Sequence, residues 1–233
     1  MKRYTILVSF LSLLLLAAAL PGVAPQERET VTRQIVLENA HVRVSRFWLE
    51  PKASTEFRST VDSIVVAIAN GTSLTLPHEQ ARPLGPGDVQ FVEKPSQLTL
   101  ENLDEKPNVN LVVELKRHWD VPMEACSTPS SCTRPVRVGS MQVGETTTLV
   151  SNGFVTVMRH RLDRGGTLQS SYYSAKGVDY VLLVPVTDID ASIGGLEEHL
   201  LHGQPYFSGA TEIEVSATET ESVWVVIRLH EPK

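Results

Sequence analysis

The stretch LENAHVRVSRFWLEPKAST, residues 37–55, decides the fold because the chain contains it twice. It matches VSNGFVTVMRHRLDRGGTL, residues 150–168, at a constant offset that pairs Arg46 with Arg159. Further segments match at nearly the same offset, as short loop insertions would produce: DSIVV with DYVLL, Gly87 with Gly203, and VVELK with VIRLH. Repetition at a fixed period predicts two similar domains in one chain.

The apolar runs of the sequence are short and rich in β-branched residues, and turn signals separate them. Examples are SIVVAIA (63–69), NVNLVVEL (108–115), YVLLVPV (180–186) and SVWVVIRL (222–229). Such runs are typical of strands, and no segment beyond the N-terminus shows a long amphipathic helical pattern, so the sequence predicts an all-β protein. The pair Asn70-Gly71 predicts a type I′ hairpin between the runs on either side of it.

The first domain is expected over residues 30–118 and the second over residues 145–231. The closing runs LVVEL and VWVVIRL are apolar on both faces, which predicts that the domains pack against each other. Residues 119–144 form the linker and contain the only cysteines, Cys126 and Cys132. In an exported protein a pair this close favours a disulfide, because a metal site would need further ligands nearby.

Residues 1–24, MKRYTILVSFLSLLLLAAALPGVA, have the pattern of a secretory signal peptide: two basic residues, an apolar run and small residues. The apolar run is short for a membrane span, although an uncleaved anchor is the alternative. We therefore expect a secreted or periplasmic protein with no stable membrane insertion after cleavage. Cleavage removes Lys2 and Arg3 and moves the formal charge from −6 to −8, which argues against a nucleic-acid partner.

The order of the pieces resembles the cupins. The segment LEPK ends a strand pair, the polar loop ASTEFRSTVDS enters the buried run IVVAIA, and GPGDVQFV precedes EN and the closing VVELK. The resemblance covers nearly all of the chain after the signal peptide. It implies two tandem jelly-roll β-barrels, a bicupin, joined by the short linker, and it is compatible with a homodimer.

Metal-binding cupins carry a Gly, five residues, a His-x-His pair and a nearby acid or His, and a last His in the second motif. The resemblance puts Lys52 at the Gly position, Arg58 and Thr60 at the His-x-His positions, Asp62 near the third ligand and Leu98 at the last His. Arginine and leucine cannot ligate a divalent metal, and threonine is a weak ligand for transition metals. We therefore expect the first barrel to lack the family metal.

The second half keeps the glycine as Gly165. The resemblance assigns its remaining ligand positions to Ser171, Tyr173, Asp179 and either Glu212 or Glu214. Only the acids are plausible ligands, and a site built from protein side chains alone normally needs at least three. We therefore expect no metal and no other cofactor in either barrel. The pair His199 and His202 lies in a predicted turn outside the barrel.

The leading hypothesis for function is an exported, metal-free protein that binds a small molecule or acts as a structural module. The alternative is an enzyme: a metal-independent isomerase or lyase on sugars or small acids, or a dioxygenase-like cupin with an unusual site in the second barrel. Arg58 and Asp62 either clamp a ligand or form an ion pair that fills the barrel mouth. Asp179 and Glu212 are the candidate acid–base pair.

Overall fold

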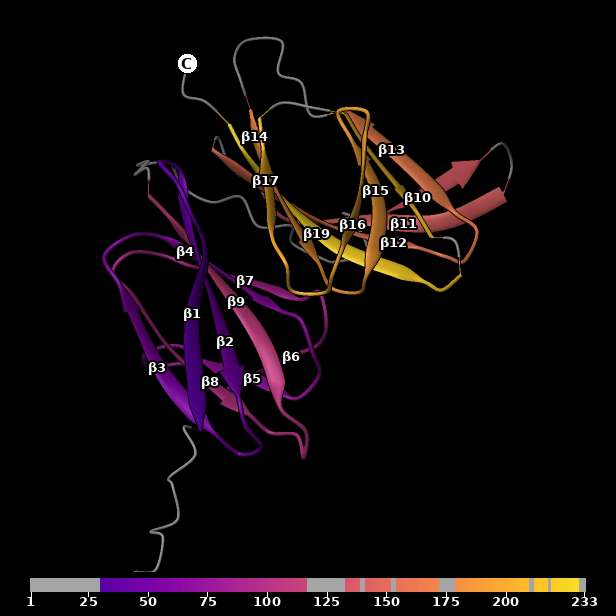
Figure 1. The fold of residues 1–233 in the computed structure, drawn as a ribbon. Helices are drawn as coiled ribbons and strands as arrows, with labels where there is room; N and C mark the ends of the chain where they lie inside the picture. Colours follow the sequence, from indigo (N-terminus) through magenta and orange to yellow (C-terminus); the bar gives the residue numbers. More distant parts are fainter. Residues whose placement is uncertain are drawn as a thin grey trace, which may run out of the picture.

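The computed structural model describes residues 30–116, 133–138, 141–151, 154–171, 179–209, 212–217 and 219–230. Every regular element in these ranges is a strand, from β1 to β19 (Figure 1), so the all-β prediction is confirmed. No described segment forms a helix long and apolar enough to cross a membrane. The predicted signal peptide and both cysteines lie outside the described residues, so the signal peptide, its cleavage and the disulfide stay predictions.

The first half consists of two antiparallel sheets. The order of one sheet is β1 (Val31–Glu38), β2 (Val42–Leu49), β9 (Asn108–Leu115), β4 (Ser63–Ala67) and β7 (Val89–Val92). The order of the other is β3 (Ser54–Ser59), β8 (Ser96–Asn102), β5 (Thr72–Thr75) and β6 (Arg82–Leu84). From β2 to β5, and again from β6 to β9, each strand lies in the other sheet from the one before it, as in a jelly roll.

The second half repeats this arrangement. Its larger sheet has the order β10 (Thr133–Val138), β11 (Met141–Ser151), β12 (Val155–Leu162), β19 (Ser222–Leu229), β14 (Tyr180–Pro185) and β17 (Tyr206–Ser208). The smaller sheet has the order β13 (Thr167–Ser171), β18 (Glu212–Ser216), β15 (Ile189–Ile193) and β16 (Leu196–Leu200). Strand for strand the order matches the first half, with β10 added at the edge, so the repeat predicted from the sequence is confirmed.

Two local predictions need correction. Strands β4 and β5, on either side of Asn70-Gly71, do not form a hairpin: β4 pairs with β7 and β9, and β5 pairs with β6 and β8. The turn carries the chain from one sheet to the other, because a reversal signal does not decide which strands will pair. The predicted linker also extends too far, since β10 and the start of β11 belong to the sheet and Gly144 pairs with Leu162.

Each barrel is filled by apolar side chains from the facing sides of its two sheets. The strand period of two sends alternate residues inward. The interior of the first barrel contains Phe47, Leu49, Ala53, Phe57, Val65, Ala67, Leu74, Leu84, Val92, Leu98, Leu100 and Val112. The interior of the second contains Leu162, Val181, Leu183, Ile189, Ala191, Ile193, Leu200, Ile213, Val215, Ala217, Trp224 and Val226.

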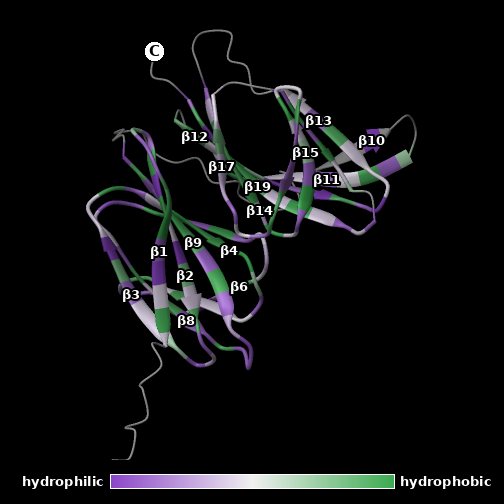
Figure 2. Cartoon of the chain, viewed as in Figure 1, coloured by the Kyte–Doolittle hydropathy of each residue, from purple (hydrophilic) through white to green (hydrophobic). Residues whose placement is uncertain are grey.

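The outer faces of the two larger sheets form one shared core. Leu111 and Val113 of β9 belong to the same buried cluster as Val225 and Ile227 of β19, which confirms that the halves pack through their closing strands. Figure 2 shows the apolar residues of both strands where the halves meet.

Two arginines at equivalent positions cross this interface in opposite directions. Arg46 donates a hydrogen bond to the Gly203 carbonyl at 2.5 Å, and Arg159 Nη1 pairs with Asp88 at 2.8 Å. Each half therefore contributes one arginine that contacts the other half, as the two subunits of a two-fold symmetric dimer do.

A substitution at Gly87 would test the contact between the two halves. The φ of Gly87 is +77°, and an added Cβ would lie 3.0 Å from Arg159 Cδ, whereas Gly165 has a φ of +76° and nothing within 4 Å. Left-handed backbone strain alone should cost Gly165→Ala about 1 kcal/mol of unfolding free energy. We expect Gly87→Ala to cost clearly more, measured by urea denaturation. Equal losses would mean that the side chains of Arg159 and Val223 move aside without cost.

Candidate functional site

The site positions predicted in the first barrel are not where the resemblance put them. On β3 the inward residue is Phe57, which is 2% exposed and pairs with Leu98 on β8. Arg58 points outward, with 70% of its side chain exposed, and bonds Glu56 at 3.2 Å. Thr60 is exposed as well. The predicted inward position of Arg58 and Thr60 is wrong, because a shift of one residue along a strand moves each side chain to the other face.

Asp62 does not pair with Arg58, so neither the predicted clamp nor the predicted ion pair forms. Its Oδ1 instead accepts a hydrogen bond from the Lys94 backbone N–H at 2.8 Å. Leu98 does lie inside the barrel, where it is 1% exposed. Lys52 has a φ of 62°, close to the 76° of Gly165, so it does occupy the glycine position of the motif.

The residues of the first barrel do not fit the metal that the fold suggests. The inward positions Phe57 and Leu98 carry hydrocarbon side chains, which donate no electron pair. Across the described ranges, no group of three or more His, Cys, Asp and Glu residues is arranged to hold a metal ion. His199, on β16 rather than in the predicted turn, bonds Asp190, and His202 bonds Asp188, both at the surface.

In the second barrel Asp179 is buried, at 2% exposure, and Arg228 Nε donates a hydrogen bond to it at 2.6 Å. Glu212 is exposed and lies opposite Ser171 in the β13–β18 ladder, and the contacts of Asp179 are with other residues, so the predicted acid–base pair with Glu212 is not seen. The Ser171 side chain and all of Tyr173 lie outside the described parts, and their predicted roles stay predictions.

A different chain of polar groups contains Asp179. His230 Nδ1 lies 3.5 Å from Asp179 Oδ2, and His230 Nε2 lies 3.0 Å from Thr156 Oγ1. Burial lowers the pKa of His230, and Asp179 offsets this only in part, so the ring is neutral near pH 7. With its proton on Nδ1, toward Asp179, the ring accepts at Nε2 a hydrogen bond from the Thr156 hydroxyl.

One more histidine lies inside the second barrel. His160 is 3% exposed, stacks on Trp224 with ring centroids 5.1 Å apart, and bonds Thr146 Oγ1 through Nδ1 at 2.9 Å. Its Nε2 has no hydrogen-bond partner in the described part of the chain. Burial lowers the pKa of His160 to about 4.

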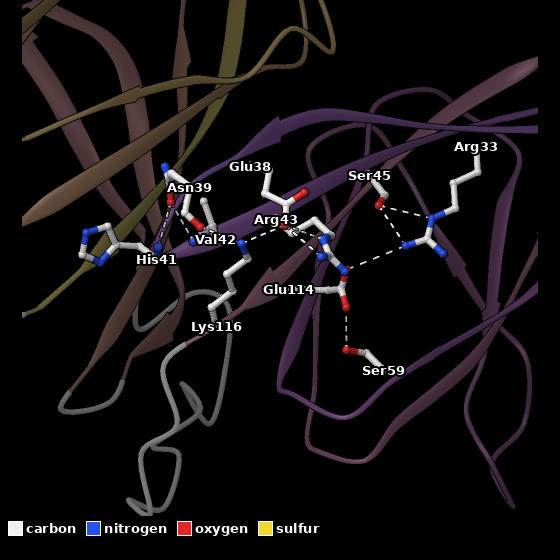
Figure 3. Close-up of polar contacts among 10 residues, drawn as sticks. All are labelled: Arg33, Glu38, Asn39, His41, Val42, Arg43, Ser45, Ser59, Glu114 and Lys116. Carbon is white, nitrogen blue, oxygen red and sulfur yellow. Dashed lines mark hydrogen bonds and ion pairs between the residues drawn. The ribbon is translucent and has the colours of Figure 1, made fainter.

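A cluster of polar and charged side chains lies at the mouth of the first barrel, around Glu114 of β9 (Figure 3). Glu114 is 8% exposed, and its Oε1 accepts a hydrogen bond from Ser59 at 2.7 Å. Its Oε2 has no hydrogen bond, with Arg33 Nη2 at 3.7 Å and Arg43 Nη1 at 4.0 Å. These distances are longer than a hydrogen bond, so both guanidinium groups attract the carboxylate but neither is hydrogen-bonded to Oε2.

The two arginines are held by other partners. Arg33 donates to Ser45 Oγ at 3.1 Å, and its guanidinium lies 5.2 Å from the centroid of the Phe57 ring, within range of a cation–π contact. Arg43 donates to Glu38 at 2.8 Å. Hydrogen bonds from Arg43 and Lys116 lower the pKa of Glu38 to about 2, so Glu38 is charged near neutral pH.

A hollow of about 430 Å³ opens beside Glu114. Its lining comes from the end of β3, the start of β8 and β9, and consists of Arg58, Ser59, Thr60, Pro95, Ser96, Gln97 and Glu114. Arg58 and Thr60 therefore belong to a hollow after all, but at the rim of the barrel rather than inside it. Hollows of this volume accommodate small molecules.

Sequence reasoning missed Glu114 because it lies within the run NVNLVVEL, which is otherwise a good buried strand. Its position carried a signal, however. Residues 108, 110, 112 and 114 share one face of that strand, and Val112 of this set lies inside the barrel. A carboxylate on the inward face of a closing strand is an uncommon buried charge.

No protein-family model and no curated protein sequence matches the chain. Solved structures do match. AerE from Microcystis aeruginosa has a TM-score of 0.63 and 10% identity over 88% of this chain and 95% of that one. A cupin 2 conserved barrel domain protein from Leptotrichia buccalis has a TM-score of 0.54 and 12% identity over 89% and 92%.

A mutant of the oxalate decarboxylase of Bacillus subtilis has a TM-score of 0.59 and 10% identity, over 84% of this chain and 72% of that one. Likeness at these identities concerns the backbone arrangement alone. The strand order supports the same conclusion independently, because each half places its strands in the two sheets of a jelly roll. The chain therefore has the fold of the cupin superfamily, and it carries that fold twice.

Proposed function

We propose that the protein is a metal-independent small-molecule-binding module whose site is the hollow at the mouth of the first barrel. One observation carries the proposal: Glu114, a carboxylate more than nine-tenths buried, lines the hollow with its Oε2 in no hydrogen bond. Native proteins seldom leave a buried polar atom unsatisfied, and such atoms mark functional positions or sites of bound molecules.

The proposal separates this protein from metal-dependent members of the fold. The same fold occurs in an oxalate decarboxylase, so the fold by itself does not decide between an enzyme and a binding protein. The interior of the first barrel argues against a metal-dependent enzyme there, because it is filled by Phe57 and Leu98, which cannot ligate a metal. A ligand would then be recognised by the polar rim, without a metal.

The cellular setting remains part of the proposal. Residues 1–24 support export to the periplasm or the medium, where an acidic protein would meet small solutes rather than nucleic acid. A homodimer is compatible with the site, which lies at one end of the first barrel.

The test is a thermal-shift screen of a small-metabolite library against chelator-dialysed protein. A ligand that binds only the folded state should raise the melting temperature in proportion to its saturation. Glu114→Gln should abolish most of the shift, while Glu197→Gln, an exposed acid on β16 of the second barrel, should leave it unchanged. Hits that keep their full shift in Glu114→Gln would contradict the assignment of the site.

A second candidate function is acid–base chemistry at the mouth of the second barrel, and the chain Thr156–His230–Asp179 favours it. A neutral imidazole oriented by a buried carboxylate is the usual form of a general base. If this chemistry is the main function, His230→Gln will abolish turnover of a substrate while Glu114→Gln retains it. A stoichiometric transition metal that survives dialysis and is lost in Asp179→Ala would contradict a metal-independent protein of either kind.

A further inference from the structure

The hollow beside Glu114 offers both hydrogen-bond donors and hydrogen-bond acceptors. The Thr60 hydroxyl and the Gln97 amide line it, are exposed, and form no hydrogen bond with another described residue. Gln97 can both donate and accept, and so can Thr60. Glu114 adds a carboxylate, whose Oε1 accepts from Ser59 of the same lining. A ligand group in this hollow thus meets partners of both kinds within a small space.

The charges around the hollow are balanced. Arg58, the one cation in its lining, is paired with Glu56, and Glu114 lies within 4.0 Å of both Arg33 and Arg43. A charged ligand of either sign would therefore meet an opposite charge that already has a partner. A neutral ligand needs no such exchange of partners.

A hydroxyl group suits the polar side chains of this lining. It can donate a hydrogen bond to the Glu114 carboxylate and accept one from the Gln97 amide or the Thr60 hydroxyl. The Pro95 ring in the lining offers an apolar surface for the C–H face of such a ligand.

We propose that the ligand of this hollow is a neutral polyhydroxylated compound, of the size of one or two sugar rings. This inference rests on the function proposed above, because it names the ligand class of the same site. The volume of about 430 Å³ is enough for one or two rings, and the hollow is open to solvent.

The test uses amide chemical shifts of the full mature chain with four probes: glucose, myo-inositol, succinate and lysine. We expect glucose or myo-inositol to shift the amides of Ser59, Thr60 and Gln97, and succinate and lysine to leave them in place. The double variant Thr60→Val/Gln97→Ala should weaken that binding about tenfold, because two ligand hydrogen bonds are lost. Gln34→Ala, an exposed glutamine on β1, is the matched control and should bind as the original chain does.

The outcomes separate the two proposals. Shifts at the hollow with succinate or lysine but not with the polyols would overturn the ligand class and leave the binding site standing. A larger library that shifts no amide around the hollow would overturn the binding function itself. Polyol binding that the double variant does not weaken would place the ligand elsewhere and overturn the inference.

Discussion

Leu111→Ala is expected to destabilise both halves of the protein together, by about 3 kcal/mol. Leu111 is fully buried, and its side chain belongs to the core that the first half shares with Val225 and Ile227 of the second. Removing it leaves a cavity that neither sheet can close alone. Because each half loses packing, the two halves should still unfold in one cooperative transition.

The measurement is urea unfolding followed by fluorescence in variants that keep a single tryptophan, either Trp48 in the first half or Trp224 in the second. The two probes should report the same midpoint before and after the substitution. Leu103→Ala, at a residue that is 48% exposed, should change the unfolding free energy by less than about 0.5 kcal/mol. Separate midpoints, with only the Trp48 transition moved by Leu111→Ala, would show that the halves do not share a core.

The second large effect is a loss of stability in acid that comes from His160. Burial lowers the pKa of His160 in the folded protein to about 4, against 6.5 in the unfolded chain. The unfolded chain therefore binds a proton first as the pH falls. The stabilisation is complete above pH 6.5 and disappears as the pH drops toward 4, by about 3 kcal/mol in all.

The matched variant is His160→Phe, because the equivalent residue of the first barrel is Phe47. Phenylalanine keeps an aromatic ring beside Trp224 and cannot be protonated. Unfolding free energies of the two proteins, measured in urea at several pH values, should converge or cross below pH 6.5, because only the original chain loses this stabilisation. Parallel pH profiles would mean that His160 does not titrate between these limits.

Much of the fold could be predicted from the sequence because the repeat and the strand periodicity act over many residues. The offset between Arg46 and Arg159 places β2 and β12 at equivalent positions, and the two apolar faces of the closing strands require a partner on each side. The pairing of β4 and β5 could not be predicted in the same way. Asn70-Gly71 signals a chain reversal, but the pairing depends on distant strands such as β9.

The site was harder to predict because the family pattern fixes positions only to within one residue. Lys52 has the expected glycine-like backbone, yet six residues later Arg58 points outward and Phe57 points into the barrel. The face of a strand changes with every residue, so a single-residue error inverts the prediction. Glu114 had no place in the family pattern. Only its position two residues after the inward Val112 indicated that its side chain faces the barrel interior.

The decisive experiment is amide chemical-shift mapping of the best ligand from the metabolite screen, on protein dialysed against a chelator. We expect the shifts to cluster at Ser59, Ser96 and Gln97, with the same affinity when a divalent metal is added back. Binding that appears only with added metal would contradict a metal-independent site. Shifts confined to residues around Asp179 and His230 would contradict a site at the mouth of the first barrel.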